Sequence, residues 1–219
     1  MATRQVVAEL ASAYRLRGGV EISIESAGGV DVARRVVAGE VFDAVFLASD
    51  AIDKLIASGH VQAGSRVNLM RSGVAAAVRK GLPRPDLSSA DAVRRAVLAA
   101  RSLSYSTGPS GVALARLFER WGIADEIAPR IVTPPPGVPV GSLIARGDVE
   151  LGFQQLSELI DVEGVEVLGA LPPAIQIVTI FSAGICAGST QPEAVRALLA
   201  FMASADAAEA KRRQGMEPA

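Results

Sequence analysis

The order of apolar and polar residues predicts an α/β protein built from two doubly wound lobes. Short apolar runs alternate with amphipathic helical patterns along the whole chain, as expected of parallel βαβ units. The pattern restarts after the proline-containing break at 81–88, which favours two lobes over one sheet. Half of the 219 residues are hydrophobic but only 4% are aromatic, a composition typical of α/β cores packed with small side chains.

The first lobe is predicted to begin with an amphipathic helix within residues 2–19, because its apolar residues recur at spacings of three and four. The alternating stretch 20–25 predicts a strand, and the small-residue turn SAGG leads from it into a helix over 30–38. A strand over 44–47 and a helix over 51–57 follow.

The second lobe repeats this alternation, and its helix near 90–100 has Ser88 or Ser89 as its predicted N-cap. The elements expected after it are strands over 102–106, 130–137, 150–155 and 165–169 and helices over 112–123 and 140–146. The β-branched run 174–188 predicts a long strand, a capping box at 190–193 opens a helix to about 203, and a last helix covers 206–214.

The apolar runs at 73–78 and 176–186 are expected to cross from one lobe to the other. The first lobe would then comprise residues 1–78 and about 180–219, and the second about 79–179, with the ligand cleft between them. Ligands of such folds bind beyond the carboxyl ends of strands and at domain interfaces. The turns that follow strands are therefore the places to search for a site.

Composition excludes several classes of function. The net charge of −1 gives no field that would recruit nucleic acid or an anionic membrane, and no apolar run is long enough to span a bilayer. A single histidine, His60, and a single cysteine, Cys186, argue against a zinc site. Phosphate-loop and dinucleotide fingerprints are missing, so we expect neither a metal nor a cofactor.

The turn STGPSG offers the best candidate anion site. It places Ser106, Thr107 and Ser110 directly before a helix, where hydroxyls and free backbone N–H groups suit an oxyanion or a carboxylate. An ordinary N-capped turn is the alternative. The turn at 26–29 poses the same choice between a binding site and a tight βα connection.

Three further polar residues are candidates for ligand contacts. Arg71 lies where an apolar crossover begins and could pair with a ligand carboxylate. A solvated arginine or a surface ion pair is the alternative. Gln154 and Gln155 end an apolar strand, where buried amides need hydrogen-bond partners. They could contact a polar ligand or face water at the start of a helix.

Taken together, these patterns resemble the molybdate-binding-protein-like group of type II periplasmic solute-binding proteins over nearly the whole chain. The segments that carry the resemblance are SAGGVDVARRVVAGEVFDAVFLASDAIDKLIASGHV, TGPSGVALARLFERWGI, LIARGDVELGFQQLSEL and the tail from FSAGICAG to GMEP. The resemblance implies two lobes joined by β crossovers that close on an anion. By position, it places ligand contacts at Ser26, Ala27 and Gly28, at Ser110, and near Val138.

Two departures from the family pattern bear on the ligand. The family begins with a strand and a serine-containing turn, whereas here the chain opens on the helix that should follow them. The resemblance thus implies either a truncated N-terminus or a missing contact. Gln155 stands where molybdate binders often have a tyrosine. Together with Arg71, it brings the sequence nearer to the divergent branch that includes aconitate isomerase-like proteins, and a small di- or tricarboxylate would fit.

The leading hypothesis is therefore a solute-binding protein, with no catalytic residue, that traps a small anion and presents it to the permease subunits of an ABC importer. One alternative is an isomerase of a small unsaturated carboxylate, with Glu158 or Tyr105 as weak acid–base candidates. Another is a cytoplasmic anion sensor. The expected location is the periplasm if the complete N-terminus carries a signal peptide, and the cytoplasm as the sequence stands.

Overall fold

A computed structural model describes residues 2–135 and 137–219. The chain forms two compact units. Unit 1 comprises Met1–Ser72 and Thr179–Ala219, and unit 2 comprises Gly73–Val178. The chain passes between the units within two strands, β2 (Val67–Arg79) and β6 (Val178–Ile185).

Unit 1 has helices on both faces of a small sheet. Its sheet has the order β1-β6-β2, with β7 added to β2, and β1 (Ala44–Ala48) runs antiparallel to β6. The other elements of unit 1 are α1 (Arg4–Leu16), α2 (Gly29–Val37), α3 (Ser49–Ala57), α8 (Pro192–Ala203), a 3-10 turn (Ala205–Ala207), α9 (Ala208–Arg213) and β7 (Glu217–Pro218).

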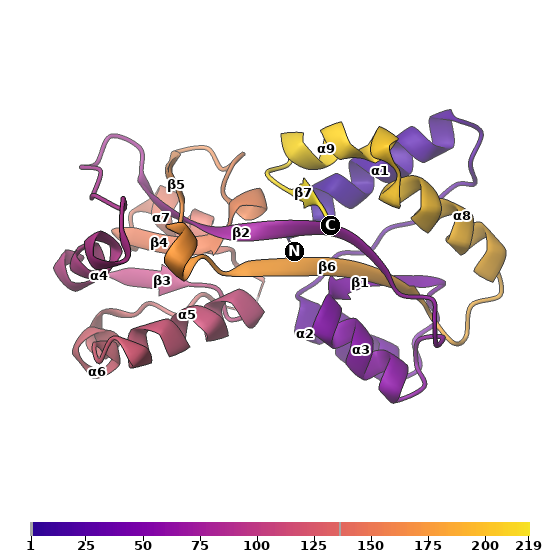
Figure 1. Cartoon of the computed structure of the whole chain (residues 1–219), viewed down its shortest axis with the longest axis horizontal. Coiled ribbons are helices and arrows are strands. Elements are labelled where there is room, and N and C mark those ends of the chain that lie inside the picture. Colours follow the sequence, from indigo (N-terminus) through magenta and orange to yellow (C-terminus); the bar gives the residue numbers. More distant parts are fainter. Residues whose placement is uncertain (1, 136) are drawn as a thin grey trace. The chain divides into compact units, whose positions relative to one another are not determined.

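The two faces of this sheet bury two separate cores. Helices α1, α8 and α9 cover one face, and α2 and α3 cover the other (Figure 1). Strand β1 shows the period of two that this layering requires: Val45 and Leu47 pack towards α2 and α3, whereas Ala44 and Phe46 pack towards α1 and α8. The doubly wound architecture predicted for the first lobe is confirmed.

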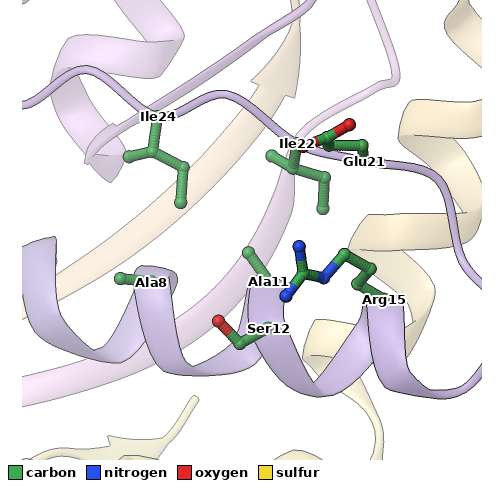
Figure 2. Close-up of a pocket in the computed structure, with 7 residues that line it drawn as sticks. All are labelled: Ala8, Ala11, Ser12, Arg15, Glu21, Ile22 and Ile24. Atoms are coloured by element: carbon green, nitrogen blue, oxygen red, sulfur yellow. The ribbon is translucent and has the colours of Figure 1, made fainter.

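The strand predicted over 20–25 is wrong. Residues 19–28 have no regular secondary structure, and Val20 is 49% exposed despite its alternating neighbours. A strand needs a neighbour for its backbone hydrogen bonds, and no strand of the described chain pairs with this segment. The segment instead runs along α1, where a hollow of about 210 Å³ is left between Ala11, Arg15 and Ile22 (Figure 2).

Cys186 lies in the core beneath α2 and α3 as a free thiol. Burial, and secondarily the nearby Asp43 carboxylate, raise its pKa to about 11. The thiolate is the reactive form, so we expect Cys186 to react with a disulfide reagent at pH 8 about a hundredfold more slowly in the folded protein than in guanidinium. Absorbance of the released thiol measures this, and equal rates would contradict the described burial.

Unit 2 is built around four strands. The carboxyl-terminal half of β2 pairs with β4 (Leu151–Gln155) and β5 (Val165–Ala170), and β3 (Leu103–Tyr105) pairs with β4. Its helices are α4 (Ala90–Ala99), α5 (Pro109–Arg120), α6 (Ala124–Ile127) and α7 (Val140–Arg146), with 3-10 turns at Ala128–Arg130, Leu156–Glu158 and Pro173–Ile175.

Among the strand pairs described within unit 2, the expectation of parallel strands holds for one. Strands β3 and β4 are parallel, whereas β2 runs antiparallel to β4 and to β5. The alternation of strands and helices does not reveal the reversed direction of β2, because it gives element order and not pairing. Parallel β3 and β4 nevertheless bring two carboxyl ends to one edge of the sheet.

The two faces of the unit 2 sheet also bury separate cores. Val74, Ala76 and Val78 of β2 pack with α4 and α5, and the intervening Ala75 and Ala77 pack against α7. This period of two explains why β2 is apolar on both faces. Ser89 caps α4 by accepting a hydrogen bond from Ala92 N at 3.1 Å, so one of the two predicted caps is confirmed.

Three smaller expectations are corrected. The strand expected over 130–137 is reduced to a single bridge between Ile131 and Leu103, since Pro134 and Pro135 supply no N–H to a ladder; Pro136 lies outside the described residues. The predicted 174–188 strand is shortened to β6, because Pro173 starts a 3-10 turn. The capping box does not form: α8 starts at Pro192 after Gln191.

Within the described residues, no helix combines the length and apolar character needed to cross a bilayer.

Candidate anion-binding site

The carboxyl edge of β3 and β4 gathers most of the candidate residues of unit 2. Because the two strands are parallel and Tyr105 lies opposite Phe153, Ser106 leaves β3 beside Gln154, which is still paired with β2 near the end of β4. The turn after β3 leads into α5, and Gln154 and Gln155 end β4. The structure therefore brings two of the predicted groups to one edge.

The turn from Ser106 to Gly111 is tightly closed. A Cβ on Gly111 would lie 1.5 Å from the backbone oxygen of Ser106, so only glycine fits there. This approach holds Ser106 Oγ 3.1 Å from Ser110 Oγ. One hydroxyl donates to the other, which leaves the accepting hydroxyl with a proton to give to a further acceptor.

The first turn of α5 presents donors without an opposing acid. The first N–H groups of a helix have no intrahelical partner, and here Pro109 leaves those of Ser110 and Gly111 as the first donors. The first turn of α5 contains no acidic residue. Its partial positive charge is therefore free to stabilise an anion.

The corresponding helix starts in unit 1 differ in this respect. Asp31 lies in the first turn of α2, within 3.4 Å of where a Cβ of Gly28 would lie, and Asp50 lies in the first turn of α3. These carboxylates already complement the helix termini and repel a bound anion. The turn of unit 2 is therefore the stronger candidate.

Gln154 is held by hydrogen bonds on the α7 side of the sheet. Its Oε1 accepts from Gly141 N at 3.2 Å, and its side chain hydrogen-bonds the Glu158 carboxyl. Because Oε1 is taken by an N–H group, the amide Nε2 is the group that donates to Glu158. Burial raises the pKa of Glu158, and the hydrogen bond from Gln154 opposes that rise.

Gln155 and Val138 have different surroundings. Gln154 and Gln155 are 4% and 3% exposed, so the alternative in which the two glutamines face water is wrong. Gln155 lies opposite Val74 in the β2–β4 ladder. Val138 N donates to Pro135 O at 3.0 Å. The backbone N–H of Val138 is thus used within its own turn.

A hollow of about 190 Å³ adjoins the Ser106–Gly111 turn. Ser106, Thr107 and Gly111 of the turn line it, together with Ile131 and Thr133. The exposed Thr107 hydroxyl is thus placed beside open space. A small ligand at the turn would have room here.

The candidates of unit 1 are less well organised. Ser26 is exposed in the irregular segment before α2, with Ala27 and Gly28 half-buried after it. Arg71 is exposed on β2 opposite Glu217 of β7, and it forms no ion pair with the residues described. No described contact joins Arg71 to the turn at Ser26–Gly28.

Unit 1 also contains a hydroxyl network that the sequence analysis missed. Ser49 Oγ lies 2.5 Å from Ser182 Oγ, and Ser182 Oγ donates to Asn68 Oδ1 at 2.8 Å. Ser49 begins α3 directly after β1, so it too lies in a turn that follows a strand. The partners come from β6 and β2, and the sequence gives no signal for that pairing.

No cluster of three or more histidine, cysteine, aspartate or glutamate side chains suited to a metal ion occurs among the described residues. The site is instead made of hydroxyls, amides and backbone N–H groups. These are donors for an anion.

Residues 1–217 match the sequence profile of the bacterial extracellular solute-binding proteins. The chain belongs to this family. Among solved structures, the periplasmic molybdate-binding protein of Azotobacter vinelandii has a TM-score of 0.81 at 21% identity, covering 98% of this chain and 94% of that one. The sulfate-binding protein of Mycobacterium tuberculosis has a TM-score of 0.75 at 18% identity, covering 99% and 82%. These similarities confirm the type II periplasmic binding fold.

A relative in sequence is the aconitate isomerase of a Pseudomonas species. It is 40% identical over 218 residues, which cover 97% of this chain and 83% of the relative. The family predicted from the sequence and its link to the aconitate isomerase-like branch are therefore both supported by sequence.

Proposed function

We propose that the protein binds a small carboxylate anion at the carboxyl edge of β3 and β4. The observation that carries this proposal is the α5 turn, where the paired hydroxyls of Ser106 and Ser110 adjoin a helix terminus with no acidic residue. Donors fixed by the fold bind an anion without reorganising, and hydrogen bonds to a charged partner are stronger than neutral ones. Thr107 and Gln155 are proposed as further contacts.

The choice of a carboxylate over a tetrahedral oxyanion rests on two arguments. The relative at 40% identity is named for a tricarboxylate substrate, whereas the molybdate and sulfate binders are at most 21% identical. The amides of Gln154 and Gln155 at the end of β4 supply planar donors beside the turn, which suit a planar carboxylate.

A thermal-shift panel tests the proposal. The probes are trans-aconitate, cis-aconitate, citrate, molybdate, tungstate, sulfate and phosphate. A ligand at a hundredfold excess over its dissociation constant stabilises the folded protein by about 2.7 kcal/mol, so a carboxylate should raise the melting temperature by several degrees. Stabilisation by molybdate or sulfate alone would contradict the proposal.

A second candidate function is the isomerisation of an unsaturated di- or tricarboxylate, favoured by the identity to the Pseudomonas enzyme. The C–H bonds of a methylene group between a carboxylate and a double bond are the acidic ones, so the reaction needs a base that moves one proton. Incubation of the protein with trans-aconitate in heavy water, followed by ¹H NMR, detects it. Deuterium in the substrate or a new cis isomer is the expected result.

If the protein catalyses no reaction, we propose that it delivers the bound anion to an ABC permease in the periplasm. The family to which the chain belongs is described as extracellular, which supports this location. Ser26, Ala27, Gly28, Arg71 and Val138 remain predicted ligand contacts. Substituting Arg71→Gln and measuring carboxylate affinity by calorimetry tests Arg71, and unchanged affinity would exclude it.

A further inference from the structure

The carboxylates near the proposed site differ in how they are held. Glu158 closes the 3-10 turn that directly follows β4, and it is half-buried. Asp161 and Glu163 follow within five residues and are exposed. Glu158 thus follows the strand whose carboxyl end forms one side of the proposed site. A half-buried acid at that edge needs an explanation, because an ionised carboxylate repels an anion.

Glu158 is held in place by a chain of two hydrogen bonds. Gly141 N donates to Gln154 Oε1, which fixes the amide of Gln154, and the amide in turn holds the Glu158 carboxyl. Gly141 itself has little freedom, since a Cβ there would lie 3.0 Å from Val162 Cγ2. The carboxyl is thus oriented by the backbone of α7 at the edge where β4 ends.

We propose that Glu158 is the catalytic residue that moves the proton in the isomerisation named above, so this inference rests on that second candidate function. Its carboxylate removes a proton from the substrate methylene. The C–H electron pair forms the new double bond, and the pair of the old double bond takes a proton from the Glu158 carboxyl at the other end of the allylic unit. The proton on the Glu158 carboxyl exchanges with solvent between the two steps, so the product formed in heavy water carries deuterium. Atoms and electrons balance without a cofactor.

The environment of Glu158 suits this role. Burial raises its pKa, which makes its carboxylate a stronger base and its acid form more abundant near neutral pH than those of an exposed glutamate. Tyr105, the other acid–base candidate, packs edge-on against Phe118 at 5.9 Å. Burial raises the pKa of its phenol, which keeps it neutral and a poor base.

The test compares Glu158→Gln with the wild type. Glutamine keeps the size of the side chain and its contact with Gln154 but does not accept a proton from carbon. We expect the variant to bind trans-aconitate within threefold of the wild-type affinity by calorimetry, while deuterium incorporation in heavy water falls at least a hundredfold. Glu158→Asp, which retains a carboxylate on a shorter side chain, should recover a measurable part of the rate.

The exposed Glu163→Gln is the matched control and should exchange deuterium at the wild-type rate. Exchange by Glu158→Gln at a rate within threefold of wild type would overturn the assignment. If wild-type protein binds the carboxylate but neither incorporates deuterium nor forms the cis isomer, the inference and the isomerase candidate fail while carboxylate binding stands. If wild-type protein binds none of the carboxylates, the proposed binding function itself fails.

Discussion

Substituting Gly111→Ala should unfold the α5 turn and abolish anion binding. The new Cβ would lie 1.5 Å from the Ser106 backbone oxygen, a clash with main chain that no rotamer relieves. Overpacking of this kind costs about 3 kcal/mol or more, because strand β3 or helix α5 must move. Thermal or denaturant unfolding measures the loss.

The matched control is Gly108→Ala in the same turn. Gly108 has a φ of −82°, and a Cβ there meets no atom within 4 Å, so alanine should change the free energy of unfolding by less than about 1 kcal/mol. A Gly111→Ala protein as stable as Gly108→Ala would show that the close approach of α5 to Ser106 is not as described.

The double substitution Ser106→Ala and Ser110→Ala should weaken carboxylate binding by about tenfold to a few hundredfold. It removes both hydroxyls and leaves the backbone donors of α5 in place, and a hydrogen bond to a charged group contributes about 1.5–3 kcal/mol. Since the hydroxyls bond each other, removing both leaves neither without its partner, and stability should change little. Calorimetry gives the affinity.

Ser102→Ala provides a comparison within the same strand region. Its hydroxyl accepts from Glu150 N at 2.9 Å, at the opposite end of β3. We expect this variant to bind carboxylate as the wild type does. Full affinity in the double variant would remove the two hydroxyls from the site, and a loss of affinity in Ser102→Ala would point to a general effect on the fold.

The parts of the fold that the sequence reveals are those with local signals. The spacing of apolar residues in α1 and the Ser89 cap of α4 depend on neighbours a few residues away, and both occur as predicted. The stretch 20–25 has the same local signal for a strand but lacks a pairing strand in the described chain. A strand forms only where a neighbouring strand accepts and donates its backbone hydrogen bonds, and the alternation of apolar and polar residues does not predict that neighbour.

The candidate site divides in the same way. Ser106 and Ser110 are recognisable because a strand, a small-residue turn and a helix follow each other in the sequence. Other contacts form only when distant elements pack together. Examples are the hydrogen bond from Gly141 N to Gln154 Oε1 and the contact between Ser49 and Ser182, which are 133 positions apart. Helix α2 is the converse case. The small residues before it suggest an anion site, but the Asp31 carboxylate in its first turn repels an anion.

The most direct test of anion binding at the α5 turn is to titrate ¹⁵N-labelled protein with trans-aconitate and to follow the amide resonances. We predict saturable shifts that include the N–H groups of Thr107, Ser110 and Gly111, because these groups lie at the proposed anion site. Saturable binding that leaves all three resonances unmoved would contradict the central claim that the α5 turn binds the anion.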